Sequence, residues 1–372
     1  MLEAGGIKPY RGGSFLSNLL ASAYIFTNNI KLLAFTINYS AAYTLRVFYS
    51  VLSLQTLLVV CVTSLLFGLS VWSLKKTKIF FFSFFFLFVT LLPYLNIVPI
   101  STLLADRYLF IPSFSFCFLL GIGFDKLYQL TYKRFSEGFF KLLSVVIFLF
   151  LLGGYSFITF QQNKVWENSY TLWSDAVAKY PESNEANALM GVVYMELGMD
   201  EKAVEYLEKA VQILPIDYES RNNLGIVYQR LEMAEKALNE LLISIALKPE
   251  NDLTKINLSV FYQRQKEYKK SEEILKQLIS KKPQDASLYF RLGVLYKEMG
   301  HYEAAVSELI KATQLAPEII NPYEELGNIY ISKIGDREKG IYYYKKGIES
   351  APKAKLAVDD LRWMIQDLEC YK

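Results

Sequence analysis

Proline recurs at a nearly constant step in the second half of this 372-residue chain, and this period limits the fold more than any other feature. One set of prolines keeps a step of 34, with a last step of 35, at Pro181, Pro215, Pro249, Pro283, Pro317 and Pro352. Tyrosine keeps the step of 34, at Tyr194, Tyr228, Tyr262, Tyr296 and Tyr330. A fixed period of this length is typical of a solenoid, in which each repeat packs on its neighbours.

Small residues share the period and indicate where paired helices approach closely. Glycine occupies one slot at Gly191, Gly225, Gly293 and Gly327, with Ser259 in the remaining slot. Alanine recurs at Ala203, Ala237 and Ala305 and again at Ala210 and Ala312. This pattern resembles the tetratricopeptide repeat, which has two antiparallel helices per unit and a proline after the second helix. It predicts an all-α solenoid with repeats that begin at residues 184, 218, 252, 286 and 320.

Both ends of the predicted solenoid depart from the period. Residues 164–183 match the second helix of a partial unit, whose first helix would be the apolar segment before it. No flexible spacer intervenes, so we expect the solenoid, residues 164–353, to dock rigidly on a membrane. The fifth repeat has one extra residue within "ISKIGDREKG", which predicts a longer turn between its helices. Residues 354–372 predict an amphipathic helix that caps the last repeat.

The segment over residues 1–163 differs sharply in composition from the rest. It contains 12 Lys and Arg but only 4 Asp and Glu, and it is dense in Phe and Leu. Apolar runs at residues 47–73, 79–98, 108–124 and 139–160 predict about four membrane spans. The amphipathic segment at about residues 14–35 is expected to lie on the membrane surface. The predicted fold is thus all-α, with a polytopic membrane domain over residues 1–163 followed by the solenoid.

Basic residues in the short loops predict the orientation of these spans. They are Lys75, Lys76 and Lys78 after the first span, and Lys126, Lys133 and Arg134 between the third and fourth spans. Such loops face the cytoplasm, which puts the repeats on the non-cytoplasmic side, in a periplasm or a lumen. The basic N-terminal segment has no signal-peptide pattern, so we expect the chain to be the C-terminal portion of a longer membrane protein.

The sequence offers no residues for a metal site and no charge pattern for nucleic acid binding. The chain has one histidine, His301, and the three cysteines Cys61, Cys117 and Cys370 have neither a pairing nor a metal-binding pattern. No metal and no cofactor are therefore predicted. The formal net charge of +3 gives no case for nucleic acid binding.

A charged pair interrupts the apolar stretch "NIVPISTLLADRYLFIPSFSF", which is predicted to begin the third span on the non-cytoplasmic side. Asp106 and Arg107 have two interpretations. In the first, Arg107 extends to the membrane interface and Asp106 starts the helix. In the second, the pair belongs to a site, since an ionisable residue at a membrane boundary is a functional hypothesis by default.

The second interpretation is favoured by a resemblance. The segment "VPISTLLADRYLFIPSFSF" resembles the signature of the transmembrane and tetratricopeptide repeat-containing proteins, which are O-mannosyltransferase-like members of the GT-C superfamily. Trp166, Glu167, Leu172 and Ala176, before the repeats, resemble the junction of that family. The resemblance implies transfer of a sugar from a lipid-phosphate donor to a protein acceptor. Arg107 would bind the donor phosphate, and Asp106, Tyr108 and Tyr94 would line the same site.

The chain departs from the family in one respect. The catalytic acid of the superfamily lies in the first outer loop near the start of the full protein, a region that this chain does not contain. No catalytic residue is predicted here, and whether the chain alone is an enzyme is left open. A membrane-anchored repeat scaffold without catalysis, or an assembly factor for an envelope complex, is the alternative.

The first helices of the repeats carry the candidate partner-binding residues. These are Asn222, Gln229, Arg230, Gln263, Arg264, Phe290 and Lys297. They form either a solvated helix face or a groove for a protein or peptide acceptor. The other expected partner is membrane lipid.

Overall fold

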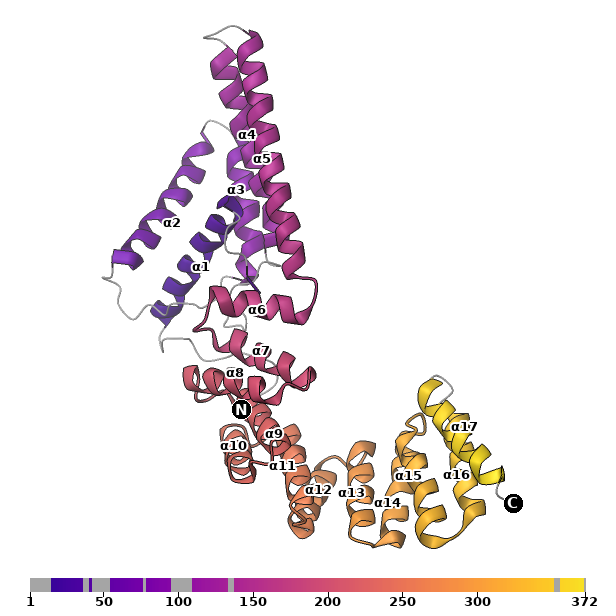
Figure 1. Ribbon diagram of the computed structural model, residues 1–372. Coiled ribbons are helices and arrows are strands. Elements are labelled where there is room, and N and C mark those ends of the chain that lie inside the picture. The colour runs from indigo at the N-terminus through magenta and orange to yellow at the C-terminus, as the bar shows by residue number, and fades with distance from the viewer. Residues whose placement is uncertain are drawn as a thin grey trace. The chain divides into compact units, whose positions relative to one another are not determined.

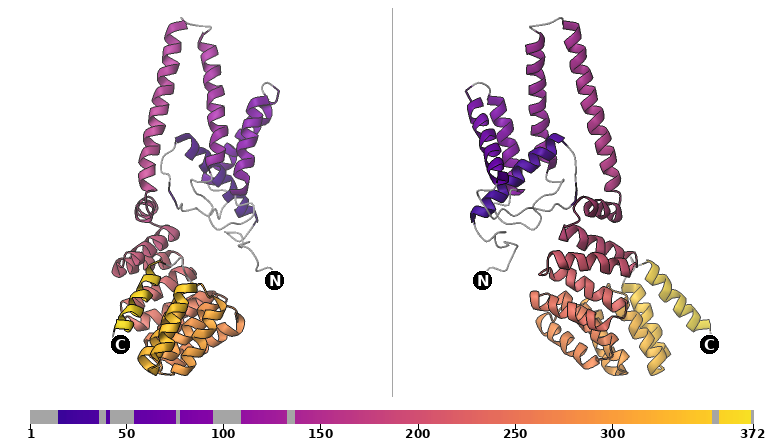
Figure 2. Two further views of the ribbon diagram at one scale, coloured as in Figure 1. Left: turned by 90° about the vertical axis from the view of Figure 1, so that its right-hand side faces the viewer. Right: turned by 60° about the vertical axis from the view of Figure 1, so that its left-hand side comes forward.

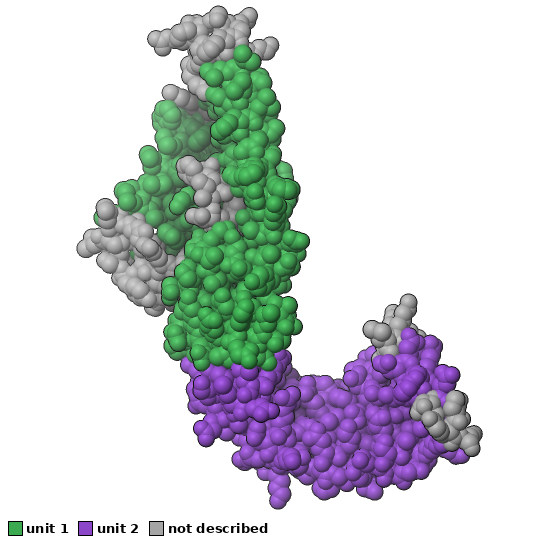
Figure 3. All heavy atoms as spheres, in the orientation of Figure 1, with its two compact units in different colours: residues 1–215 green, residues 216–372 purple. Residues whose placement is uncertain are grey.

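The computed structural model describes residues 15–35, 40–41, 54–75, 78–94, 109–132, 137–350 and 355–370, and the regular structure within these ranges is helical. The chain divides into two compact units, residues 1–215 and 216–372 (Figure 3). This division is one of packing and falls inside the repeats, whereas the sequence boundary after residue 163 is one of composition. The domain limits predicted from composition therefore stay a prediction.

The first part of unit 1 consists of apolar helices (Figure 1). They are α1 (Phe15–Phe35), α2 (Leu54–Ser73), α3 (Lys78–Leu91) with the 3-10 turn η1 (Leu92–Tyr94), α4 (Phe110–Tyr132) and α5 (Glu137–Val165). The segment predicted to lie on a membrane surface is α1, and it buries Ile25, Phe26, Leu32 and Leu33 against Phe84, Leu87 and Leu91 of α3 and against Leu109. Its position relative to a membrane stays a prediction.

One helix within the described ranges is long and apolar enough to cross a membrane. It runs over Leu142–Val165 for 24 residues and none of it is buried. Its side chains Phe148, Phe150 and Phe157 are exposed, which is costly in water and favourable in lipid. Two further apolar stretches, Leu57–Ser73 within α2 and Lys78–Leu91, which is α3, are shorter than this helix. The structure thus supports one span, and the other three of the predicted four are not confirmed.

The pair α4 and α5 leaves an apolar cavity. The two helices lean apart along part of their length (Figure 2). The cavity beside them measures about 530 Å³. Its lining is almost entirely apolar and includes Phe116 and Leu120 of α4, Phe148 and Leu152 of α5, and Leu33 of α1. These exposed apolar walls suit an acyl chain or another helix better than water.

The repeats follow α5 after a short turn that contains Trp166, Glu167 and Asn168. Unit 1 ends with α6 (Ser169–Lys179), α7 (Asn184–Glu196) and α8 (Asp200–Ile213). Unit 2 contains α9 (Tyr218–Arg230), α10 (Ala234–Leu247), α11 (Asp252–Arg264), α12 (Tyr268–Lys281), α13 (Ala286–Glu298), α14 (Tyr302–Leu315), α15 (Asn321–Ile329), α16 (Arg337–Ser350) and α17 (Lys355–Cys370). Within unit 2 the hairpins follow one another as a stack (Figure 1).

Capping residues fix where the first helix begins in four of the five repeats. Ser183, Asp217, Asn251 and Asp285 keep the step of the period, and each side chain accepts a hydrogen bond from a backbone N–H of the helix that follows. An oxygen at this position satisfies one of the donors that the first turn leaves free. The helices α7, α9, α11 and α13 therefore begin at residues 184, 218, 252 and 286. The first helix of the fifth repeat, α15, has no such cap and begins at residue 321, one residue after the predicted start of that repeat.

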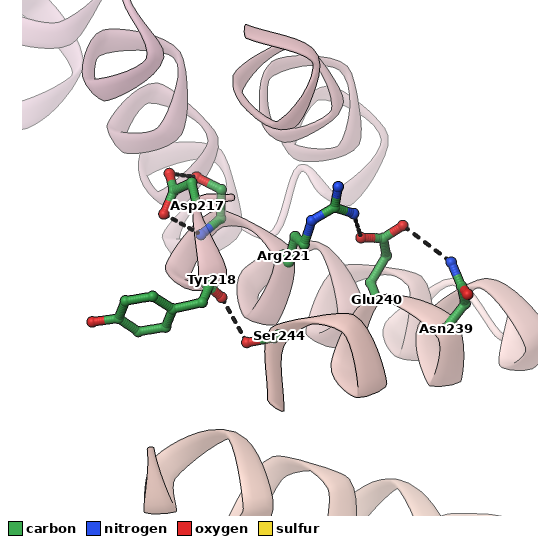
Figure 4. Close-up of polar contacts among 7 residues, drawn as sticks. Asp217, Tyr218, Arg221, Asn239, Glu240 and Ser244 are labelled. Atoms are coloured by element: carbon green, nitrogen blue, oxygen red, sulfur yellow. Dashed lines mark hydrogen bonds and ion pairs between the residues drawn. The ribbon is translucent and has the colours of Figure 1, made fainter. Parts of the chain in front are cut away.

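Polar contacts also join the two helices of a hairpin, as in the second repeat (Figure 4). Arg221 on α9 pairs with Glu240 on α10 at 2.6 Å, with both side chains largely shielded from solvent. The Ser244 hydroxyl donates to the backbone carbonyl of Tyr218 at 2.7 Å. These contacts cross between antiparallel helices and so hold their register.

The turn between paired helices needs one residue in the left-handed region. This residue is Gly198, Glu232, Lys266, Gly300 and Gly335 in successive repeats, with φ between 59° and 81°. A side chain at such a φ costs about 1–2 kcal/mol, which glycine avoids.

Replacing Lys266 by glycine is accordingly expected to raise the free energy of unfolding by about 0.5–1 kcal/mol, net of the entropy that glycine adds to the unfolded chain. Chemical unfolding of the detergent-solubilised chain, followed by circular dichroism, measures the change. The matched control is Lys269→Gly in the first turn of α12, where glycine should destabilise by about 1 kcal/mol. Equal losses of stability in the two variants would show that the left-handed φ carries no cost here.

The extra residue of the fifth repeat lies elsewhere than the sequence predicts. A longer turn was expected, but α15 continues into a π-helical turn, Tyr330–Ile334, and only Gly335 and Asp336 separate it from α16. A π-turn absorbs one inserted residue without ending the helix. The expectation of a longer inter-helix turn was wrong for this reason.

The last helix, α17, packs on the fifth repeat. Val358, Leu361 and Ile365 are buried in a cluster with Ile320 and Tyr344. The opposite face carries the exposed Trp363 and the exposed ion pair of Arg362 with Asp359.

Candidate functional site

The first helices of the repeats in unit 2, α9, α11, α13 and α15, form one surface, here called the first-helix face. Two contacts join neighbouring helices across it. The amide Nδ2 of Asn257 on α11 donates to Oδ1 of Asn222 on α9 at 2.8 Å. The ammonium of Lys297 on α13 pairs with Glu325 on α15 at 2.7 Å. These contacts close the face between α9 and α11 and between α13 and α15.

The face is open between α11 and α13. No side-chain hydrogen bond or ion pair joins these two helices, which are described over their whole length. A hollow of about 280 Å³ lies between them. Its lining consists of Val260, Gln263, Arg264, Phe290, Arg291, Val294 and Glu298.

Helical spacing explains how these side chains meet. Val260 and Arg264 are one turn apart on α11, and Phe290, Val294 and Glu298 are on successive turns of α13. The two valines and Phe290 are half-buried, whereas both arginines and Glu298 are exposed. The hollow thus combines an apolar floor with a charged rim, an arrangement that suits an apolar side chain with a polar neighbour.

In the fifth repeat, the first-helix face carries an acidic residue where the fourth repeat has Phe290. Glu324, on α15, occupies the slot one period after Phe290. Burial, with the nearby carboxylates of Glu325 and Asp360, raises the pKa of the Glu324 carboxyl above its usual value. The folded state therefore holds this proton more tightly than the unfolded chain does, and ionised Glu324 lowers the stability of the fold at neutral pH.

The structure brings some of the predicted groove residues together and separates others. Gln263, Arg264 and Phe290 line the hollow. Asn222 is buried and bonded to Asn257, while Lys297 is engaged by Glu325, so both link neighbouring helices. The remaining two, Gln229 and Arg230, lie at the end of α9, half-buried and exposed respectively. A binding role for all seven stays a prediction.

The prediction missed Val260, Arg291, Val294 and Glu298. The repeat period contained a signal for one of them, because Glu298 follows the predicted Arg264 by one period. Equivalent positions in adjacent repeats lie side by side, so extending a predicted position by one period finds its neighbour.

The predicted donor-phosphate site lies almost wholly outside the described residues. This applies to Asp106, Arg107 and Tyr108. Tyr94 is the last residue of η1, and its side chain is not among those described. The interpretation of Arg107 as a phosphate ligand is therefore a proposal.

The repeats match a known family. A model of the family described as tetratricopeptide repeat matches residues 185–216, 286–319 and 320–353. The chain therefore contains tetratricopeptide repeats. Its repeats in unit 2 show the paired helices, the close glycine contacts and the period of that family. Tetratricopeptide repeats generally mediate binding of proteins or peptides.

Part of the chain is also similar to O-mannosyl-transferases. It is 28% identical to Protein O-mannosyl-transferase Tmtc2 of Drosophila melanogaster over 131 residues, which cover 35% of this chain and 13% of the fly protein. Over 119 residues it is 27% identical to Protein O-mannosyl-transferase TMTC3 of Homo sapiens, covering 32% and 12% of the two chains. The match thus spans only a small fraction of each relative.

Solved structures of two other proteins are similar to part of the chain at low identity. A MamA fragment of Desulfovibrio magneticus RS-1 is 22% identical, with 45% of this chain and 94% of that chain covered and a TM-score of 0.39. A tetratricopeptide repeat protein of Parabacteroides merdae is 22% identical, with 56% and 80% covered and a TM-score of 0.46. Likeness at this level carries no functional argument.

Proposed function

We propose that the chain is part of a GT-C-type membrane glycosyltransferase that transfers a sugar from a lipid-phosphate donor to a protein acceptor. Arg107 binds the donor phosphate, with Asp106, Tyr108 and Tyr94 beside it. The tetratricopeptide repeats hold the acceptor protein, or a partner that presents it. Both sites face the non-cytoplasmic side of the membrane.

The observation that carries this proposal is the partial similarity to O-mannosyl-transferases in a chain that joins an apolar helix directly to tetratricopeptide repeats. The chemistry of the donor supports the role of Arg107. An anionic phosphate leaving group is held best by a guanidinium, which presents a planar fork of hydrogen-bond donors. The hollow between α11 and α13 supports the role of the repeats, because it offers apolar and charged contacts on one open face.

A transfer assay tests the proposal. Membranes that contain the protein in its native form are incubated with a labelled lipid-phosphate mannose, and the label bound to protein is measured. We expect the label to be lost in membranes from cells without the gene and restored when the gene is returned. Unchanged labelling in the absence of the gene would contradict the proposal.

The second candidate is a membrane-anchored scaffold without catalysis. It is favoured by the repeats themselves, because the family model matches three segments of them and an open hollow lies between α11 and α13. A scaffold predicts that partner binding survives every change to Arg107, whereas the enzyme predicts loss of transfer from the same change.

A further inference from the structure

We propose that the hollow between α11 and α13 binds a carboxylate side chain, of Asp or Glu, that neighbours an apolar residue in an extended segment of the bound protein. This inference rests on the part of the proposed function in which the repeats hold a protein. It adds the chemical class of the segment and the residues that recognise it.

The size of the hollow limits its occupant. Its volume of about 280 Å³ is just below the roughly 300–1,000 Å³ of pockets that enclose a small molecule. The hollow therefore accepts one or two side chains and leaves the rest of the segment on the surface. The apolar floor of Val260, Phe290 and Val294 provides a place for one apolar side chain.

The charges at the rim of the hollow select the residue that neighbours the bound apolar side chain. Arg264 and Arg291 are exposed, and neither forms an ion pair with any residue in the described part of the chain. Both guanidinium groups are thus free to bind a carboxylate as a bidentate partner. Glu298 is the one acid in the lining, so the two arginines leave the hollow positive.

Neighbouring positions on the first-helix face do not offer the same charge. Lys297 is already neutralised by Glu325 at 2.7 Å. The position equivalent to Phe290 in the fifth repeat is Glu324, which has Glu325 and Asp360 nearby. Glu325 is neutralised in turn by Lys297, but Glu324, with Asp360 nearby, repels a carboxylate from α15. Charge complementarity therefore places the acidic residue of the segment at the hollow.

A peptide array tests this inference. Immobilised peptides of about twelve residues, long enough to bind in extended form, are built on a Gly and Ser background, and their two central positions run through all pairs of amino acids. They are probed with the full chain in detergent. We expect the highest binding for pairs of one acidic and one apolar residue. The double change Arg264→Gln with Arg291→Gln should lower binding of these pairs by about tenfold.

Matched variants separate recognition from misfolding. Lys269→Gln with Lys281→Gln removes the same charge from the exposed surface of α12, and this control should keep the acidic preference. Arg264→Glu with Arg291→Glu should shift the preference to pairs that contain Lys or Arg, a gain that an unfolded chain cannot produce. Phe290→Ala should weaken selection of the apolar residue.

The outcomes distinguish this inference from the function on which it rests. Binding without preference for acidic residues, or with preference for basic ones, would overturn the inference and leave the repeats as a protein-binding surface. Binding of no peptide would also overturn it. The transfer assay judges the glycosyltransferase proposal independently of either result.

Discussion

Replacing Arg107 by alanine is expected to lower sugar transfer by at least about 100-fold, the effect of removing one preorganised donor from a developing anion. The guanidinium would hold the lipid phosphate while the glycosidic bond breaks, when negative charge on the phosphate increases. A lysine keeps the charge but lacks the bidentate fork, so Arg107→Lys should retain part of the activity. Labelled lipid-phosphate mannose and native membranes provide the measurement.

The control for this prediction is a basic residue predicted to lie on the other side of the membrane. Lys126→Ala should leave transfer unchanged. Circular dichroism of the solubilised variants should show that helix content is intact in both. Full activity of Arg107→Ala would reduce Arg107 to a residue that anchors a helix at the membrane interface, and the donor site would have to be sought elsewhere.

Replacing Gly293 by alanine is expected to lower the free energy of unfolding by about 1–3 kcal/mol, the usual cost of overpacking. A methyl group at this position would lie 2.7 Å from Cγ of Leu309 and 3.2 Å from the carbonyl oxygen of Ala305. Leu309 is fully buried, so it cannot move away without disturbing α14. Chemical unfolding followed by circular dichroism measures the loss.

The third repeat provides a natural control, because Ser259 occupies the slot that glycine fills in the other repeats. Its backbone already accommodates a Cβ atom, so Ser259→Ala should cost only the bond from the serine hydroxyl to the carbonyl of Ile256, about 1 kcal/mol or less. If Gly293→Ala were no more destabilising than Ser259→Ala, close helix approach would not be the reason for glycine.

The repeats could be predicted because their signals are local and recur. Asp217, Asn251 and Asp285 cap the first helices at the step of the period, and each needs only its own following turn to act. The hollow could not be predicted in the same way. The hollow exists because no side chains bridge α11 and α13, which are described over their whole length, whereas Asn257 and Asn222 bridge α11 and α9. The distance between two neighbouring helices, which decides whether a bridge can form, is a property of the packed repeats.

The fifth repeat and the apolar helices also differ from what the sequence predicts, each for a specific reason. Counting residues revealed the insertion in the fifth repeat, but the choice between a longer loop and the π-turn at Tyr330–Ile334 depends on competing backbone hydrogen bonds. Apolar length alone suggested a span over residues 79–98. The backbone there does not form one regular helix, because α3 ends at Leu91 and the 3-10 turn Leu92–Tyr94 follows.

Labelling of Cys370 in sealed membranes tests the central claim, that the repeats share the non-cytoplasmic side with Arg107. The protein carries Cys61→Ser and Cys117→Ser, so that Cys370 is its one cysteine, and is treated with a membrane-impermeant maleimide. A second protein with Cys370→Ser and Lys126→Cys reports the opposite side. The account predicts that Cys370 reacts when the non-cytoplasmic face is outward and that the cysteine at position 126 reacts when the cytoplasmic face is outward. Reaction of Cys370 from the cytoplasmic side would contradict the account.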